Sequence, residues 1–256
     1  MIARAIWIAV HQLRRAVWIV RGPLLIAIGA TAVAAVALVA ASGALASGPA
    51  RPPTPATTVP AAPSPPEPTA SYTFLITDPV TGQPVRFDPC ARSIAVEYNP
   101  VNARYPAETD VQEATNRLAQ AMGRPVAYIG TTNISFTEFE RHPPTTPTIF
   151  VDWIPSASQL SSPMPDLVGQ AAPFAEGDRI VFSHVTLVSG ADLAPGFGPS
   201  SFGADLLHEF GHAVDAGHVT AQSEQMYPQL VPGRPAGYGP GDIAGLHVLA
   251  GTCHSK

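Results

Sequence analysis

The stretch that decides the expected fold spans residues 207–218 and reads LHEFGHAVDAGH. On a helix, His208 and His212 are four residues apart, so their imidazoles project from one face about one turn apart. Two imidazoles at this separation can bind one Zn²⁺ ion, with Zn–N distances of about 2.0–2.1 Å. Glu209 lies beside the first histidine and can act on a water molecule without binding the metal. The pattern therefore predicts a zinc site of the kind that hydrolases use.

A third histidine strengthens this interpretation. His218 follows His208 by ten residues, and Gly217 can break the helix so that the chain returns a third imidazole to the same metal. Three protein ligands with a free fourth position are typical of catalytic zinc, whereas structural zinc has four protein ligands. We therefore expect His208, His212 and His218 as ligands and Glu209 as the catalytic residue. The alternative is a set of ordinary histidines on a core or surface helix.

The motif resembles the metzincin metallopeptidases, whose pattern H-E-x-x-H-x-x-G-x-x-H is followed by a turn with a methionine. The sequence looks most like the matrixin branch, notably its small actinobacterial members, because Met226 lies eight residues after His218 in the tetrapeptide QMYP. The resemblance implies a structural role for Met226, as a hydrophobic floor below the zinc. It covers residues 208–228 closely, and residues 242–249 and 84–98 more loosely.

One position departs from the family pattern. Asp215 stands where the pattern has a glycine, and the nearest glycine is Gly217. The family glycine takes a left-handed backbone conformation, which Asp adopts more readily than most other residues. The turn is therefore expected either at Asp215 or shifted to Gly217.

The resemblance implies a zinc endopeptidase in which Glu209 is the general base, acting on a protein or peptide substrate. In related folds the substrate lies along an edge strand, which residues 170–174 or 179–184 could provide. Two alternatives remain: a non-catalytic cell-envelope protein with a structural zinc, and an amidase that acts on cell-wall peptides. The intact Glu209 favours catalysis, because a structural site does not need this carboxylate.

A second metal ion is a further property that the resemblance allows. Matrixin-like domains can carry an additional structural zinc or calcium ion, and the loose candidates for its ligands are His142, Asp152 and His184. These residues do not support a second site, so we predict one catalytic zinc ion. Separately, the protein is predicted to be a monomer.

Patterns elsewhere in residues 71–256 alternate between strand and helix. Runs of β-branched and aromatic residues predict strands at residues 72–77, 84–88, 93–98, 126–129, 148–153 and 179–187. Apolar residues spaced three or four apart predict helices at residues 107–122, 202–214 and 242–250. A sheet followed by helices predicts an α+β fold. With the resemblance, this becomes a zincin-like metzincin domain with a mixed twisted sheet, an active-site helix and a C-terminal helix.

Charge is distributed unevenly along the 256 residues. Residues 1–70 contain five arginines and one glutamate (net +4), and residues 71–256 contain nine basic and eighteen acidic residues (net −9). An acidic folded domain argues against nucleic-acid binding. Only 13% of the residues are charged, about half the usual ~25%, which excludes a coiled coil.

The N-terminal part predicts export. Residues 1–22 form a basic segment expected in the cytoplasm, and residues 23–46 form an apolar segment expected to be a transmembrane signal-anchor or a signal peptide. Residues 47–70 are a proline-rich linker, followed by the matrixin-like domain at residues 71–256. The expected location is the cell membrane with the domain outside, or secretion after cleavage following Ala46.

The chain has two cysteines, Cys90 and Cys253. An exported chain meets an oxidising environment, in which an isolated pair can form one disulfide. The alternative is two buried free thiols.

Overall fold

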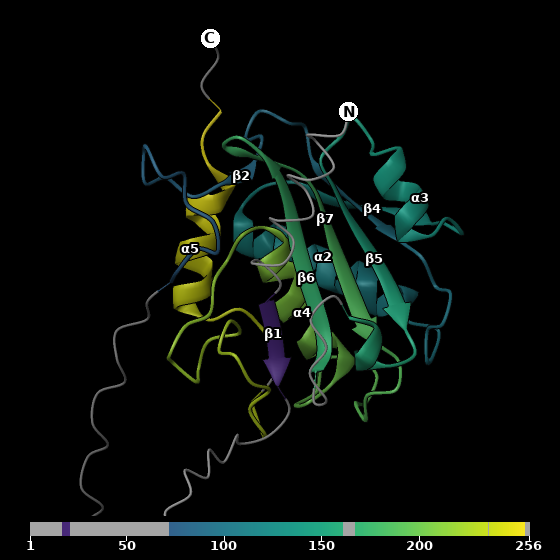
Figure 1. The fold of residues 1–256 in the computed structure, drawn as a ribbon. Helices are drawn as coiled ribbons and strands as arrows, with labels where there is room; N and C mark the ends of the chain where they lie inside the picture. Colours follow the sequence, from purple (N-terminus) through teal and green to yellow (C-terminus); the bar gives the residue numbers. More distant parts are fainter. Residues whose placement is uncertain (1–16, 21–71, 161–166, 235, 254–256) are drawn as a thin grey trace, which may run out of the picture. The chain divides into compact units, whose positions relative to one another are not determined.

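The computed structural model describes residues 17–20, 72–160, 167–234 and 236–253 (Figure 1). These residues form a seven-stranded sheet with the order β1-β6-β7-β5-β3-β4, and β2 pairs with β7 off this path. The strands are β1 (Val17–Val20), β2 (Arg86–Phe87), β3 (Ile94–Tyr98), β4 (Val126–Thr131), β5 (Thr148–Ile154), β6 (Leu167–Glu176) and β7 (Arg179–Val188). The helices are α2 (Glu108–Met122), α3 (Phe136–Arg141), the 3₁₀ helix η1 (Ala157–Gln159), α4 (Phe202–Ala213) and α5 (Pro240–Ala250).

The centre of the sheet is parallel and one side is antiparallel. Strands β4, β3, β5 and β7 run parallel, whereas β6 is antiparallel to β7 and β1 is antiparallel to β6. Strand β5 has the sequence TIFVDWI and its first four residues are all buried, as expected of a parallel strand covered on both faces. The mixed sheet with its helices confirms the predicted α+β fold.

Alternate residues of β5 face the two layers that cover the sheet. Ile149 and Val151 belong to the main core with α2 and α4, whereas Phe150 belongs to a smaller cluster with Phe139 of α3. In Figure 1, α2 and α4 lie behind the sheet. Helix α4 is therefore enclosed between the sheet and the other helices, and each of its twelve residues is buried.

Local signals in the sequence explain the helix ends. Ser201 caps α4, because its side chain accepts a hydrogen bond from the backbone N–H of Ala204. Helix α2 ends at Gly123, which takes the left-handed conformation with φ +66°. Both helices begin within a residue or two of where the apolar spacing predicts.

Two predicted strands differ from the structure, and one helix was not predicted. The strand expected at residues 72–77 is reduced to two isolated bridges, Phe74 with Ala216 and Thr77 with Pro84. The strand expected at residues 84–88 contains only the two residues of β2, and the sequence analysis assigned no helix to the six residues of α3.

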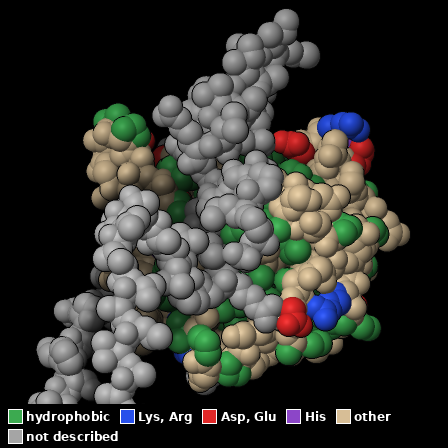
Figure 2. All heavy atoms as spheres, turned by 60° about the horizontal axis from the view of Figure 1, so that its bottom comes forward, with side chains coloured by type: hydrophobic (Ala, Val, Ile, Leu, Met, Phe, Trp, Pro, Cys, Tyr) green, Lys and Arg blue, Asp and Glu red, His purple; other side chains and the backbone are tan. Residues whose placement is uncertain are grey.

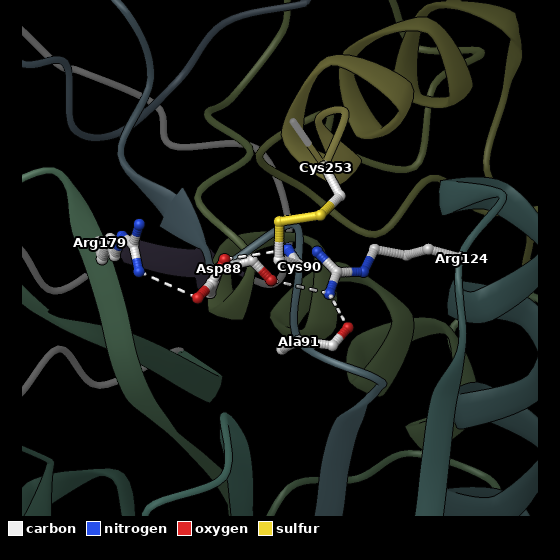
Figure 3. A network of polar contacts seen from close by, with 6 residues as sticks. All are labelled: Asp88, Cys90, Ala91, Arg124, Arg179 and Cys253. Atoms are coloured by element: carbon white, nitrogen blue, oxygen red, sulfur yellow. Dashed lines mark hydrogen bonds and ion pairs between the residues drawn. A yellow bond between two sulfur atoms is a disulfide. The ribbon is translucent and has the colours of Figure 1, made fainter. Parts of the chain in front are cut away.

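A disulfide joins Cys90, which precedes β3, to Cys253, which follows α5 (Figure 3). Around it, Asp88 accepts a hydrogen bond from the backbone N–H of Cys90 and pairs with Arg179 at 2.9 Å. Arg124 donates to the backbone carbonyls of Asp88 and Ala91. This network attaches the C-terminal end of the domain to the start of the sheet.

The predicted membrane localisation needs correction. Among the residues with a described structure, no helix is long and apolar enough to cross a membrane, so the transmembrane helix and single-pass topology inferred from the sequence are wrong on this finding. The segment on which that inference fell, residues 23–46, lies outside the described ranges, as does the linker at residues 47–70. Part of the predicted cytoplasmic segment forms β1 at the sheet.

The face of the molecule seen in Figure 2 carries few charged side chains among its coloured atoms, and these lie in small mixed groups near the rim. The absence of a nucleic-acid partner stays a prediction from the net charge.

Candidate metal centre

Helix α4 and the loop after it bring three histidines together. Their Nε2 atoms are 2.8 Å apart for His208 and His212, and 3.2 Å apart for His218 and each of the other two. His208 and His212 are buried in α4, and His218 lies five residues beyond the end of this helix. These residues could hold a metal ion, and no other such group of His, Cys, Asp or Glu occurs in the described part of the chain.

Two backbone carbonyls set the tautomers of the helical histidines. Nδ1 of His208 lies 2.8 Å from the carbonyl oxygen of Gln225, and Nδ1 of His212 lies 2.7 Å from that of Ala216. A carbonyl oxygen only accepts, so each Nδ1 carries the proton and each neutral ring presents an Nε2 lone pair. This second hydrogen bond is typical of metal-binding histidines.

Burial keeps the imidazoles neutral. It lowers the pKa of His208 to about 3, with a further effect from His218, and lowers the pKa of His218 to about 4. The pKa of His212 is also well below the usual value, first because of burial and then because of the other two histidines. The three rings are therefore neutral imidazoles at neutral pH.

The donor set fits zinc. Three nitrogens that bind one tetrahedral zinc ion are about 3.3 Å apart, because each Zn–N bond is ~2.0–2.1 Å. The observed separations of 2.8–3.2 Å come close to this spacing. Lone pairs that converge without a proton between them repel each other, and a cation at their centre removes this repulsion. Imidazole is also a donor that suits zinc.

Glu209 is fully buried on the same helix, and neither carboxylate oxygen has a hydrogen-bond partner. Burial raises its pKa well above the usual value, and the charge of Asp205 raises it further. Glu209 follows the first histidine in the sequence, and its carboxylate has no hydrogen-bond partner among the described protein groups.

Asp205 is a neighbour of the centre that the sequence analysis missed. It lies one helical turn before Glu209, is fully buried, and also has two oxygens without a partner. Burial raises its pKa to about 8. A Cβ atom at Gly169 of β6 would lie 2.7 Å from its Oδ2, so the carboxyl group points at this strand. The available signal was the spacing of two acids, four apart, in an otherwise apolar helix.

Met226 packs directly against α4. It is buried, and a Cβ atom at Gly211 would overlap its Sδ atom, so only glycine permits this close approach. The backbone N–H of Met226 donates to Asp242, and its carbonyl accepts from Val219. The structure thus places the methionine against the helix that carries the histidines.

Asp242, in the first turn of α5, orients the segment that contacts His208. One oxygen accepts from the N–H of Gln225 and Gly239, and the other accepts from Met226. Gln225 in turn accepts the Nδ1 proton of His208 through its carbonyl. The sequence analysis assigned Asp242 only to the start of a helix, because this role depends on a contact between distant segments.

The turn after α4 is kept at Asp215, which has φ +87°, and is not shifted to Gly217. Two of the three candidates for a second metal site come together, and the third lies elsewhere. His184 pairs with Asp152 at 2.9 Å and stacks on Phe136, whereas His142 lies near Glu138.

The two segments considered as edge strands differ in the structure. Residues 179–184 belong to β7, which is paired on both sides by β5 and β6 and is therefore internal. Residues 170–174 belong to β6, whose other side pairs with β1 at Val17 and Trp18. Neither segment is therefore a free edge strand among the described residues.

No protein-family model matches the sequence, and no curated protein matches it. Among solved structures, the crystal structure of metalloproteinase-II from Bacteroides fragilis is similar over 72% of this chain, with 14% identity and a TM-score of 0.41. The chain covers 59% of the length of that protein. This likeness is too distant to assign an activity.

Proposed function

We propose that this protein is a matrixin-like zinc endopeptidase. The observation that supports this best is the convergence of three neutral imidazoles beside the uncommitted buried carboxylate of Glu209. The separation of Met226 from His218, which matches the matrixin pattern, supports the assignment to this branch. The disulfide between Cys90 and Cys253 is typical of proteins in an oxidising compartment.

Metal binding and proton transfer would fall to different residues. His208, His212 and His218 would hold the zinc ion, which supplies a Lewis acid that polarises a peptide carbonyl and lowers the pKa of water. Glu209 would accept the proton of the attacking water and pass it to the leaving amine. Burial raises the pKa of Glu209 above its usual value, which is the direction in which proteins tune a carboxylate for general acid–base work.

The same geometry argues against a purely structural zinc. A structural site has four protein ligands, but the group found in the described residues contains three.

The test is hydrolysis of quenched fluorescent peptides and of an unfolded protein by the zinc-loaded full chain and its Glu209→Gln variant. We expect the variant to keep its zinc and lose about 10²–10⁴-fold in kcat, because it lacks the general base. The matched control is Glu113→Gln, the same change at a surface position of α2. Comparable turnover by Glu209→Gln, or no hydrolysis by the wild type, would contradict the proposal.

A further inference from the structure

The third histidine differs from the other two because no helix positions it. His208 and His212 are fixed by α4, but His218 sits on the loop that follows Ala213. The first residues of that loop are held by local hydrogen bonds, from the N–H of Asp215 to His212 and from the N–H of Ala216 to Gly211. What holds the loop closer to His218 must come from elsewhere in the chain.

A short segment from the start of the domain lies along this loop. We call Thr73–Ile76 the strap, and it pairs with the loop through an antiparallel bridge between Phe74 and Ala216. Two backbone hydrogen bonds flank the bridge, from Leu75 to the carbonyl of Asp215 at 3.0 Å and from Gly217 to that of Thr73 at 2.8 Å. The strap therefore follows the loop up to the residue before the third histidine.

Two side chains complete the attachment. The hydroxyl of Thr73 donates to the backbone carbonyl of His218 at 2.8 Å. The carboxylate of Asp215 accepts from the backbone N–H of Ile76 at 2.9 Å, and this contact is buried. Gly217 permits the close approach, because a Cβ atom there would overlap the hydroxyl of Thr73.

The backbone of Asp215 shows why this side chain matters. Its φ of +87° is a conformation that glycine takes without strain and that Asp takes at some cost. A glycine, which the family pattern has here, would allow the same turn but could not bond to Ile76. Compared with glycine, Asp215 therefore has a strained backbone but makes a buried hydrogen bond to the strap.

We propose that Asp215 is a positioning residue for the third ligand. Its carboxylate ties the strap to the loop, and the strap, through Thr73, holds His218 against the two histidines of α4. This inference rests on the zinc site of the proposed function, but it does not depend on peptide hydrolysis. It makes residues 73–76, which are more than 130 positions from the histidines in sequence, a part of the metal centre.

The experiment compares Asp215→Gly, Asp215→Asn and Thr73→Val in the full chain. Zinc affinity is measured by competition with a chromophoric chelator, and ligand geometry by the visible absorption of the cobalt-substituted protein. Asp215→Gly keeps the turn and loses the link, so we expect zinc affinity to fall about 10–100-fold with a changed cobalt spectrum. Asp215→Asn retains an oxygen acceptor and tolerates the left-handed turn, so it should restore most of the affinity. The zinc affinity of Thr73→Val should lie between the affinities of the two Asp215 variants.

The control is the double variant Cys90→Ser/Cys253→Ser, which removes the disulfide at a distance from the histidines. It should lower the melting temperature and leave the zinc affinity and the cobalt spectrum unchanged. The inference is overturned if Asp215→Gly behaves like this control, with lower stability but wild-type affinity. If the wild type binds zinc through His218 but hydrolyses no peptide, the proposed function is refuted. The role of Asp215 is still decided by the zinc affinities and cobalt spectra of the variants.

Discussion

Two buried acids, Asp205 and Glu209, are the residues that depart most from ordinary core chemistry. Each has both carboxylate oxygens unpaired in a helix with no exposed residue. Burying a polar group without a partner costs free energy, and proteins tolerate this mainly where function requires it. Glu209 has a proposed catalytic role, and the charge of Asp205 raises the pKa of Glu209.

Asp205 should make stability depend on pH. Burial raises its pKa in the folded protein from 3.8 to about 8, so the unfolded chain releases the proton at lower pH than the folded protein does. Raising the pH from about 4 to 8 therefore favours unfolding, and this cost is absent in Asp205→Asn. The melting temperature of the metal-free variant should rise relative to the wild type across this window.

The stability of Asp78→Asn relative to the wild type should change with pH in the opposite direction. Hydrogen bonds from Thr81 lower the pKa of the exposed Asp78, so its ionised form stabilises the folded protein above pH ~4. This variant should lose stability relative to the wild type as the pH rises towards ~4, and the difference should then stay constant, because the lowered pKa places the titration of Asp78 below its usual value. Thermal unfolding below pH ~4 measures the effect of Asp78→Asn, and thermal unfolding from pH 4 to 8 measures the effect of Asp205→Asn. A flat difference for Asp205→Asn would contradict the burial argument.

At the scale of the elements, α4 depends on close contact with the segment that follows it. Gly211 lies in the last turn of this helix, and alanine within a helix normally stabilises by about 1 kcal/mol relative to glycine. Here the added methyl group would overlap Met226, which is buried between α4 and Asp242 of α5. The usual preference for alanine should therefore be reversed.

We expect Gly211→Ala to lower the free energy of unfolding by about 1–3 kcal/mol, as other overpacked core substitutions do. Met226→Ala should also destabilise, because it leaves a cavity. The double variant should lose less than the sum of the two, since the smaller side chain makes room for the methyl group. Urea unfolding of the four proteins measures the coupling, and strict additivity would show that the two side chains do not compete for space.

At the scale of the whole molecule, the disulfide closes the domain. Cys90 and Cys253 are 163 positions apart, and the chain between them includes most of the sheet and the metal centre. In the chain-entropy model, closing so long a loop stabilises by up to about 4–5 kcal/mol. Arg124, Asp88 and Arg179 support the same junction (Figure 3).

Removing the disulfide should therefore lower stability without removing the metal. We expect Cys90→Ser/Cys253→Ser to unfold at a lower urea concentration and to retain its bound zinc. Urea unfolding followed by circular dichroism and metal analysis of the folded protein measure the two effects. Mapping under non-reducing conditions checks the bond itself, and two alkylatable thiols in the native wild type would contradict it.

The sequence by itself determined the parts that depend on local spacing. The apolar positions of residues 107–122 predict α2, and those of residues 202–214 predict α4. The histidine motif predicts which three imidazoles converge, because helical spacing places two of them and the glycine-containing loop returns the third. These features follow from hydrogen bonds and side-chain directions within a few residues of the chain.

The tertiary structure decided what depends on contacts between distant segments. Strand β6 is rich in Ala and contains Gly and Pro, and its position follows from pairing with β7. Residues 72–77 have a strand pattern, yet they pair mainly with the loop at Asp215, and Asp242 reaches His208 only through Gln225. A local pattern specifies a conformation but not a partner, since the partner is set by how the whole chain buries its apolar surface and satisfies its buried polar groups.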